Sequence, residues 1–268
     1  MVNDSIGRYK NLFRHIQNWQ GYFLRKLKKG FQPMEFVTRG HHRKFIVPSK
    51  ALYLVFKEIF VTDFYDIDQV VLSLPPNPVI IDIGANAGYF DIALFSKIKE
   101  ATVYAYEPIA SNYELFRKNI ALNAGLEKNI HLHNKAVTGT PQENIELYME
   151  AASDNSVIAS VYTDFDAQNQ HIIRVPAISL MQILEQNNIE KVDLLKMDCE
   201  GSEYPIIYET PAAAWTKIQQ LTVEVHNLDD DKRNVDALRQ FLEEKQFSVT
   251  TEFAHASCYA LTAVKKNA

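Results

Sequence analysis

Residues 79–90 read Val-Ile-Ile-Asp-Ile-Gly-Ala-Asn-Ala-Gly-Tyr-Phe, and the rest of the chain is best understood outward from them. A run of β-branched residues predicts a buried strand, and the small residues after it predict a loop where the backbone approaches a ligand. A helix from Phe90 to about Lys97 is expected next, then an apolar strand from Val103 that ends at Glu107. In such strand–loop–helix–strand units an acid at this position accepts hydrogen bonds from the two hydroxyls of a ribose. The segment therefore predicts the nucleoside pocket of an α/β enzyme.

The glycine spacing in this loop indicates which nucleoside is bound. Dinucleotide-binding enzymes need the pattern G-x-G-x-x-G, because a pyrophosphate must touch bare backbone at the helix N-terminus. Here Gly84 and Gly88 flank Asn86, and Tyr89 stands where the last glycine would be expected. These side chains would crowd a pyrophosphate, whereas S-adenosylmethionine has no phosphates and has an amino-acid end that Asp82 and Asn86 could bind. The pattern favours a methyltransferase over a dehydrogenase, and a turn without any ligand is the remaining alternative.

The composition is that of an ordinary globular protein. The 268 residues suit one α/β domain with an extension, and 47% of them are hydrophobic and 23% charged. No apolar run approaches the roughly 18 residues that cross a bilayer, and the N-terminus lacks the apolar block of a secretory signal. Cys199 and Cys258 do not have the spacing of a disulfide scaffold or a zinc site, so the reducing cytoplasm is the expected compartment.

Positive charge is concentrated at the N-terminus. Residues 1–50 contain eleven Lys or Arg against two acids, a balance of +9, within a total charge of −5. Residues 8–29 carry apolar side chains at helical spacing among basic ones, which predicts one amphipathic helix. Its apolar positions are Leu12, Ile16, Trp19, Phe23 and Leu27. This arm either lies on an anionic membrane surface, or packs on the catalytic domain or on the second subunit of a homodimer.

Two domains are expected, a basic extension over residues 1–50 and a catalytic domain over 51–268. The extension contains the amphipathic helix and a hairpin of residues 35–38 and 44–47. A second amphipathic helix is expected over residues 51–60.

From residue 79 onward, predicted strands and helices alternate, which indicates a mostly parallel sheet with right-handed crossovers. The later strands are expected at residues 103–106, 130–133, 192–197, 221–225, 247–251 and 259–264. The last two have no helix between them, which predicts an antiparallel pair at the end of the sheet. Residues 138–178 are less regular and predict an insertion near the site, with short strands at 145–149 and 172–175.

Polar side chains follow the fourth and fifth strands at the edge of the sheet where ligands bind in open α/β folds. Asp198 and Glu200 follow one strand, and Glu224 and His226 lie on one face of the next. Methylation of a hydroxyl needs a base, because the alcohol loses its proton as it attacks the sulfonium methyl group. His226 fits that role near its ordinary pKa. We therefore predict these four residues as the catalytic set.

A divalent metal is an open alternative at the same place. Some O-methyltransferases hold Mg²⁺ with carboxylates at these two strand ends, where the ion positions the acceptor oxygen and lowers its pKa. The four predicted catalytic residues could supply oxygen and nitrogen ligands to Mg²⁺ or Mn²⁺. The spacing of the residues does not require a metal.

Several motifs together resemble the FkbM-type S-adenosylmethionine-dependent methyltransferases. They are residues 79–90, Tyr106-Glu-Pro108, Asn134-Lys-Ala-Val137, Leu195-Lys-Met-Asp-Cys-Glu-Gly-Ser-Glu203 and Val223-Glu-Val-His226. The resemblance covers about residues 50–230. It implies a Rossmann-like class I fold, with a seven-stranded sheet whose last strand is antiparallel, and methyl transfer to a hydroxyl of a sugar or polyketide. The implied cofactor-binding residues are Asp82, Gly84, Ala85, Asn86, Gly88, Phe90, Glu107, Pro108 and Ala136.

The leading hypothesis is an O-methyltransferase that acts on a glycan or a related secondary metabolite. A non-catalytic methyltransferase-like module recruited by its basic arm is an alternative, but such modules usually lose the cofactor loop or the ribose acid. Nucleic-acid methylation is a further alternative. Against it, the basic residues lack the interleaved aromatic residues of a single-strand groove, and the tetrapeptide that clamps a flipped base is absent after Asp198.

Overall fold

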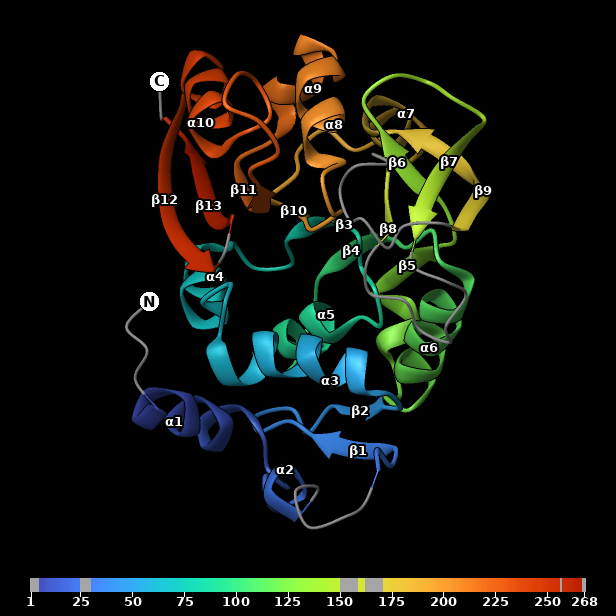
Figure 1. Ribbon diagram of the computed structural model, residues 1–268, viewed down its shortest axis with the longest axis vertical. Helices are drawn as coiled ribbons and strands as arrows, with labels where there is room; N and C mark the ends of the chain where they lie inside the picture. The colour runs from blue at the N-terminus through green and yellow to red at the C-terminus, as the bar shows by residue number, and fades with distance from the viewer. Residues whose placement is uncertain (1–4, 25–29, 150–158, 162–170, 256, 267–268) are drawn as a thin grey trace.

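A central seven-stranded sheet organises the molecule in the computed structural model, which describes residues 5–24, 30–149, 159–161, 171–255 and 257–266 (Figure 1). The strand order is β12-β13-β11-β10-β3-β4-β5. The strands are β3 (Val79–Ile83), β4 (Thr102–Tyr106), β5 (Ile130–His133), β10 (Leu194–Met197), β11 (Gln220–His226), β12 (Phe247–His255) and β13 (Cys258–Lys265). Only β13 runs against its neighbours β11 and β12, while the pairs from β11 to β5 are parallel. The predicted Rossmann-like class I fold is confirmed, including its antiparallel last strand.

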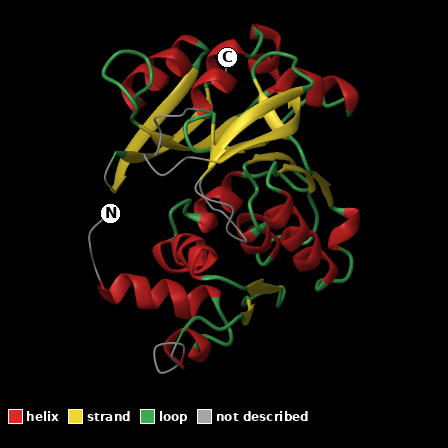
Figure 2. Ribbon diagram, turned by 45° about the vertical axis from the view of Figure 1, so that its right-hand side comes forward, coloured by secondary structure: helices red, strands yellow, loops and turns green. Residues whose placement is uncertain are grey.

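Helices cover both faces of the sheet, which lies between them in Figure 2. The covering helices are α5 (Tyr89–Phe95), α6 (Ala110–Ala121), α7 (Leu180–Gln186), α8 (Glu203–Glu209), α9 (Ala212–Lys217) and α10 (Val235–Glu244), and the short 3-10 turn η3 (Leu126–Lys128) precedes β5. Successive side chains of a strand point to opposite faces. Accordingly Ile80 packs in one hydrophobic cluster with α5 and α6, and Ile81 packs in a second cluster with α7 to α10. Both clusters are buried, so the strand ends are held rigidly.

The N-terminal arm contains two short helices rather than the single helix predicted over residues 8–29. They are α1 (Ser5–His15) and α2 (Gln20–Leu24). The helix stops because the chain pairs with the hairpin: Ile16 bridges Thr38, and the Asn18 side chain accepts from the Val37 N–H at 2.8 Å and donates to the Glu35 carbonyl at 2.9 Å. The end of the predicted helix, including Leu27, lies outside the described residues.

The predicted hairpin is present as β1 (Met34–Val37) and β2 (Lys44–Val47), and it packs on the catalytic domain. Phe36 of the hairpin stacks on Phe56 with ring centroids 4.4 Å apart. Leu12 and Ile16 have no exposed surface and belong to the same hydrophobic cluster as the sheet residue Ile80. Leu12 and Ile16 therefore pack on the catalytic domain, which is one of the placements expected for the arm.

Some basic residues of the arm bind backbone carbonyl groups of the catalytic domain. The Arg43 Nε donates to the Phe95 carbonyl at 3.2 Å, and the His41 N–H donates to the Ser96 carbonyl at 3.0 Å. Gly40 has a φ of +76°, and a Cβ there would lie 2.1 Å from the Ser96 oxygen. The hairpin loop thus caps the C-terminal end of α5, where cationic groups and donors are favoured.

The segment that follows the hairpin is helical but interrupted. Helix α3 (Lys50–Lys57) is followed directly by a π-helical turn, η2 (Glu58–Thr62), and then by α4 (Ile67–Ser73). The predicted helix over residues 51–60 is therefore present with a change of winding at Glu58. π-helical turns occur frequently at functional sites.

The insertion forms a small sheet of its own, in the order β6-β9-β7-β8. Its strands are β6 (Ala136–Thr138), β7 (Asn144–Met149), β8 (Ala159–Ser160) and β9 (His171–Ser179). The two strands predicted in this segment correspond to β7 and to part of β9. In the parts of the chain that the structure describes, no helix is long and apolar enough to cross a bilayer.

Candidate active site

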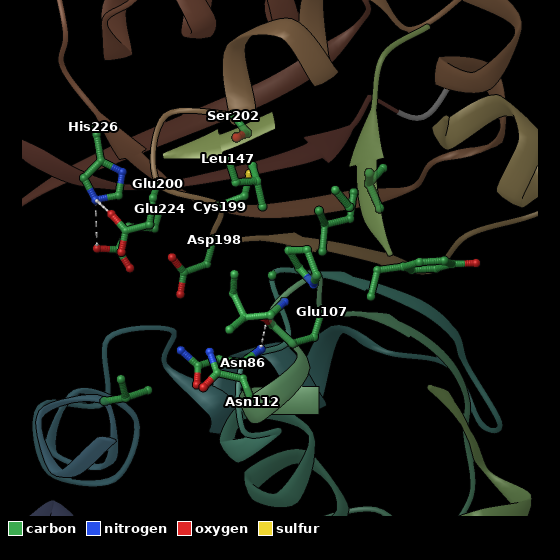
Figure 3. A pocket seen from close by; sticks show the side chains of 18 of the residues that line it. Asn86, Glu107, Asn112, Leu147, Asp198, Cys199, Glu200, Ser202, Glu224 and His226 are labelled. Carbon is green, nitrogen blue, oxygen red and sulfur yellow. Dashed lines mark hydrogen bonds and ion pairs between the residues drawn. The ribbon is translucent and has the colours of Figure 1, made fainter. Parts of the chain in front are cut away.

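One cavity of about 630 Å³ collects most of the predicted site residues at the carboxyl ends of β3, β4, β10 and β11. Figure 3 shows its side chains, with the Asn86–Glu107 group at one end and the His226 group at the other. From the predicted cofactor set, Gly84, Asn86, Glu107, Pro108 and Ala136 line the cavity. From the predicted catalytic set, Asp198, Glu200, Glu224 and His226 all line it.

Glu107 lies at the end of β4 with only 4% of its surface exposed. Its Oε2 accepts the Asn86 N–H and its Oε1 accepts the Ile109 N–H, both at 2.8 Å. Burial raises the pKa of Glu107 to about 7, although these backbone donors and Lys196 oppose the shift. Each oxygen keeps an acceptor site beyond its backbone donor. The Glu107 carboxyl group is therefore held in a fixed orientation at the wall of the cavity.

Two glycines in the loop are required by close packing. A Cβ on Gly84 would lie 1.7 Å from the Asp198 carbonyl oxygen, and a Cβ on Gly88 would lie 2.1 Å from the Phe116 ring. Both have a φ of +76°, and Asn86 between them has a φ of +50°. Gly84 thus holds the loop after β3 against the loop after β10, and Gly88 allows α6 to approach.

Four residues of the predicted cofactor set do not line the cavity, namely Asp82, Ala85, Gly88 and Phe90. Asp82 has no exposed surface, and the Lys196 ammonium lies 3.1 Å from it. The same ammonium donates to the Gly84 carbonyl at 2.9 Å. Burial alone would lower the pKa of Lys196, but the carboxylates of Asp82 and Asp198 raise it above its ordinary value, so the ammonium stays charged. Asp82 therefore supports the loop from behind.

His226 is surrounded by carboxylates on both sides of its ring. Nδ1 lies 3.3 Å from Glu203, and Nε2 lies 3.4 Å from Glu200 and 3.6 Å from Glu224. Only the imidazolium can donate from both nitrogens at once. Burial would lower the pKa of His226, but these three carboxylates raise it to about 10. The pKa of His226 thus lies above the ordinary value expected from the sequence, which favours the imidazolium at neutral pH.

The carboxylates of the site are crowded and poorly hydrated. Burial, Asp198 and other acids raise the pKa of Glu224 to about 8, and the pKa of Glu200 is also raised to about 8. Glu200 has a φ of +50°, a strained value for this residue type and one that often marks a functional site. Asp198 lies between this group and the Asn86–Glu107 group in Figure 3. The carboxyl groups of Asp198 and Glu107 thus lie in one cavity.

Two sets of side chains could hold a metal ion. Glu58, Asp198 and Glu224 offer carboxylate oxygens that lie within 4.8 Å of one another, and Glu224, His226 and Cys258 offer a mixed set at the same spacing. Exposed and half-buried acids commonly gather without an ion. Of these side chains, the His226 ring already lies 3.6 Å from the Glu224 carboxylate.

Residues 82–249 match the methyltransferase FkbM domain. The chain belongs to the FkbM methyltransferase family.

It is similar to methyltransferase sdnD of Sordaria araneosa, with 27% identity over 233 residues that cover 75% of this chain and 83% of the relative. It is also similar to the 31-O-demethyl-FK506 methyltransferase FkbM of Streptomyces tacrolimicus, with 26% identity over 219 residues that cover 74% and 82%. Among solved structures, M. capricolum TrmK in complex with S-adenosyl-homocysteine aligns with a TM-score of 0.45 and 14% identity over 76% of this chain and 68% of that one. The family membership makes this protein an S-adenosylmethionine-dependent methyltransferase.

Sequence reasoning missed several residues of this FkbM-family site. Leu54, Val55 and Glu58 reach the cavity from α3 and η2, and Ile145 and Leu147 reach it from the insertion strand β7. These residues belong to no motif, and the spacing of the chain gives no signal for them. Glu203 is different, because it ends the quoted motif and a buried acid there could have been assigned to His226.

The charges around His226 predict how stability depends on pH. Between pH 4.5 and about 8, folded Glu200 and Glu224 hold protons that the unfolded chain has released. Between pH 6.5 and about 10, folded His226 does the same. Since the folded state binds more protons throughout, raising the pH should destabilise it. We expect the thermal unfolding midpoint to fall steadily from pH 6 to pH 9, and to fall less steeply in Glu200→Gln. A midpoint that rises with pH over this range would contradict the arrangement.

Proposed function

We propose that this enzyme transfers the methyl group of S-adenosylmethionine to a hydroxyl of a glycan or a related secondary metabolite. The observation that carries the proposal is the position of Asp198, a carboxylate between the nucleoside end of the cavity and the acidic group around His226. A hydroxyl acceptor needs such a proton acceptor next to the methyl donor. The relative from Streptomyces tacrolimicus is named as a methyltransferase of a 31-O-demethyl compound, which supports methylation at an oxygen.

The residues of the cavity fit the cofactor. Glu107 offers a buried carboxylate for the ribose hydroxyls, and the Gly84–Asn86 backbone is open toward the cavity. Pro108, Ile109, Ala136 and Leu147 provide apolar surface where the adenine would lie. When bound, S-adenosylmethionine supplies an electrophilic methyl group on a sulfonium.

In this proposal, Asp198 accepts the proton of the acceptor hydroxyl. As the hydroxyl oxygen bonds to the methyl carbon, the bond between that carbon and the sulfonium sulfur would break to leave S-adenosylhomocysteine, and the proton of the hydroxyl would pass to the Asp198 carboxylate. His226 keeps its own proton, and its Nε2 lies 3.4 Å from Glu200 and 3.6 Å from Glu224. Glu203 holds the imidazolium from behind through Nδ1 and the His226 backbone N–H. In this proposal Asp198 is the base, and Glu200, Glu224 and His226 are the polar groups that surround it.

Mass spectrometry tests the proposal directly. The enzyme is incubated with S-adenosylmethionine carrying an isotope-labelled methyl group and with separate pools of nucleotide sugars, lipid-linked glycans and polyketides. We expect a product heavier than its precursor by one labelled CH₂ group, at an oxygen. Label that appears only in RNA or DNA would replace the proposal with nucleic-acid methylation. Cofactor binding without any labelled product would favour the binding-module alternative.

Chelation tests the role of the carboxylates. Because Asp198 accepts the proton and the His226 imidazolium compensates Glu200 and Glu224, we expect EDTA to leave the initial rate unchanged. The rate is measured on the acceptor identified above, before and after dialysis against EDTA. Activity that disappears and returns with Mg²⁺ or Mn²⁺ would reassign these carboxylates as metal ligands.

A further inference from the structure

Tyr65 lies in a tightly held turn between η2 and α4. Asp63 and Asp66 both have positive φ values, +57° and +47°. The Asp63 carboxylate accepts the Ile67 N–H at 3.1 Å and lies 3.3 Å from the His15 Nε2 of α1. The turn is therefore fixed by contacts to both neighbouring helices, and it places the Tyr65 side chain toward the sheet.

The ring of Tyr65 is held equally firmly. It is only 6% exposed and packs edge-on against Phe90, with ring centroids 5.3 Å apart. The Lys196 ammonium lies 5.7 Å from the Tyr65 ring centroid. Burial and the nearby carboxylates of Asp198, Glu224 and Glu58 raise the pKa of Tyr65 well above its ordinary value, so the hydroxyl remains a proton donor.

That hydroxyl donates to Asp198 Oδ2 at 3.0 Å. The Lys196 ammonium faces the same oxygen at 3.8 Å. Both hydrogen-bonding or charged partners named here thus lie on the Oδ2 side of Asp198, so Oδ1 can accept a proton. The other carboxyl groups near Asp198 belong to Asp82, Glu58, Glu200 and Glu224. Without the Tyr65 hydroxyl, the orientation of the Asp198 carboxylate would depend on the more distant Lys196 ammonium.

We propose that Tyr65 is a positioning residue that keeps the Asp198 carboxylate turned toward the methyl position of S-adenosylmethionine. The inference rests on the proposed role of Asp198. It also means that a segment before the family-matched residues 82–249 completes the active site. The sequence gives no motif for this residue, because its contact with Asp198 spans 133 positions of the chain.

Binding of two cofactor analogues tests the inference without an acceptor. Sinefungin carries an amine where S-adenosylmethionine carries its sulfonium methyl, and S-adenosylhomocysteine carries nothing there. A correctly placed carboxylate should therefore make the wild type bind sinefungin more tightly than S-adenosylhomocysteine. Calorimetry on the full chain should show that Tyr65→Phe lowers this preference roughly tenfold, as expected for losing a hydrogen bond to a charged group. The affinity for S-adenosylhomocysteine should change less than about twofold.

Two further variants make the result specific. Tyr208→Phe is the matched control, because it removes a hydroxyl that donates to the Lys232 carbonyl at 2.7 Å, and it should leave the preference unchanged. Asp198→Asn should abolish the preference, and adding Tyr65→Phe to it should have no further effect. A full preference in Tyr65→Phe, or an equal loss of affinity for both analogues, would overturn the inference. Absence of any methylated hydroxyl product would remove the proposed function but would leave this result intact.

Discussion

Glu107→Ala is expected to weaken the binding of S-adenosylhomocysteine by at least about tenfold. The variant removes two charge-assisted hydrogen bonds to the ribose, each worth on the order of 1.5–3 kcal/mol. It also releases the Asn86 and Ile109 N–H groups that the carboxylate now accepts, so the loop after β3 loses its anchor. Both effects act on affinity in the same direction.

Isothermal calorimetry measures this loss, and circular dichroism shows whether the fold is kept. Glu114→Ala provides the matched control, because Glu114 lies on the outer surface of the neighbouring helix α6, where its side chain is 49% exposed. That variant should bind with wild-type affinity. Unchanged affinity in a folded Glu107→Ala protein would remove Glu107 from the ribose site.

Asp198→Asn is expected to reduce turnover by roughly 100-fold or more, because the amide cannot accept the acceptor proton. His226→Ala should cause a comparable loss for a different reason: Glu200, Glu203 and Glu224 would lose their common counter-ion. Cofactor affinity should change little in His226→Ala, since His226 lies at the far end of the cavity from Glu107.

Initial rates on the identified acceptor provide the measurement. Asp193→Asn is the control within the same segment, because Asp193 precedes β10 at the opposite end of the strand and accepts the Val79 N–H at 2.9 Å. It should keep the wild-type rate even if its stability falls. Wild-type rates in both Asp198→Asn and His226→Ala would mean that the chemistry occurs elsewhere.

The architecture of the sheet could be predicted because its signals are local. The apolar strand of residues 79–83, the loop after it and the missing helix before β13 are each visible in a short window of sequence. The end of helix α1 at His15 could not be predicted in this way, because it depends on hydrogen bonds from Asn18 to a hairpin that lies seventeen or more positions away. Side-chain bonding to a distant backbone overrides helical periodicity there.

The residues of the candidate site likewise fall into some that the sequence predicts and some that it does not. Asp198, Glu200, Glu224 and His226 were found because carboxyl ends of parallel strands meet at one edge of a sheet. Tyr65 and Glu58 were not found, since tertiary packing alone brings η2 and its following turn to that edge. The raised pKa of His226 could not be predicted from the sequence either, because it requires Glu203 of helix α8 to be buried next to Nδ1.

The close approach of Gly84 to the Asp198 carbonyl has a consequence for how acceptor preference can change in evolution or by design. The two loops that touch there cannot be remodelled one at a time, because a side chain in the first would displace the second. Variation that preserves catalysis is therefore directed to the other walls of the cavity. Those walls carry Leu54 and Val55 on α3 and Ile145 on β7, all of them aliphatic and none of them engaged in the charged network. Libraries built at these three positions should yield altered acceptor ranges with the catalytic apparatus intact.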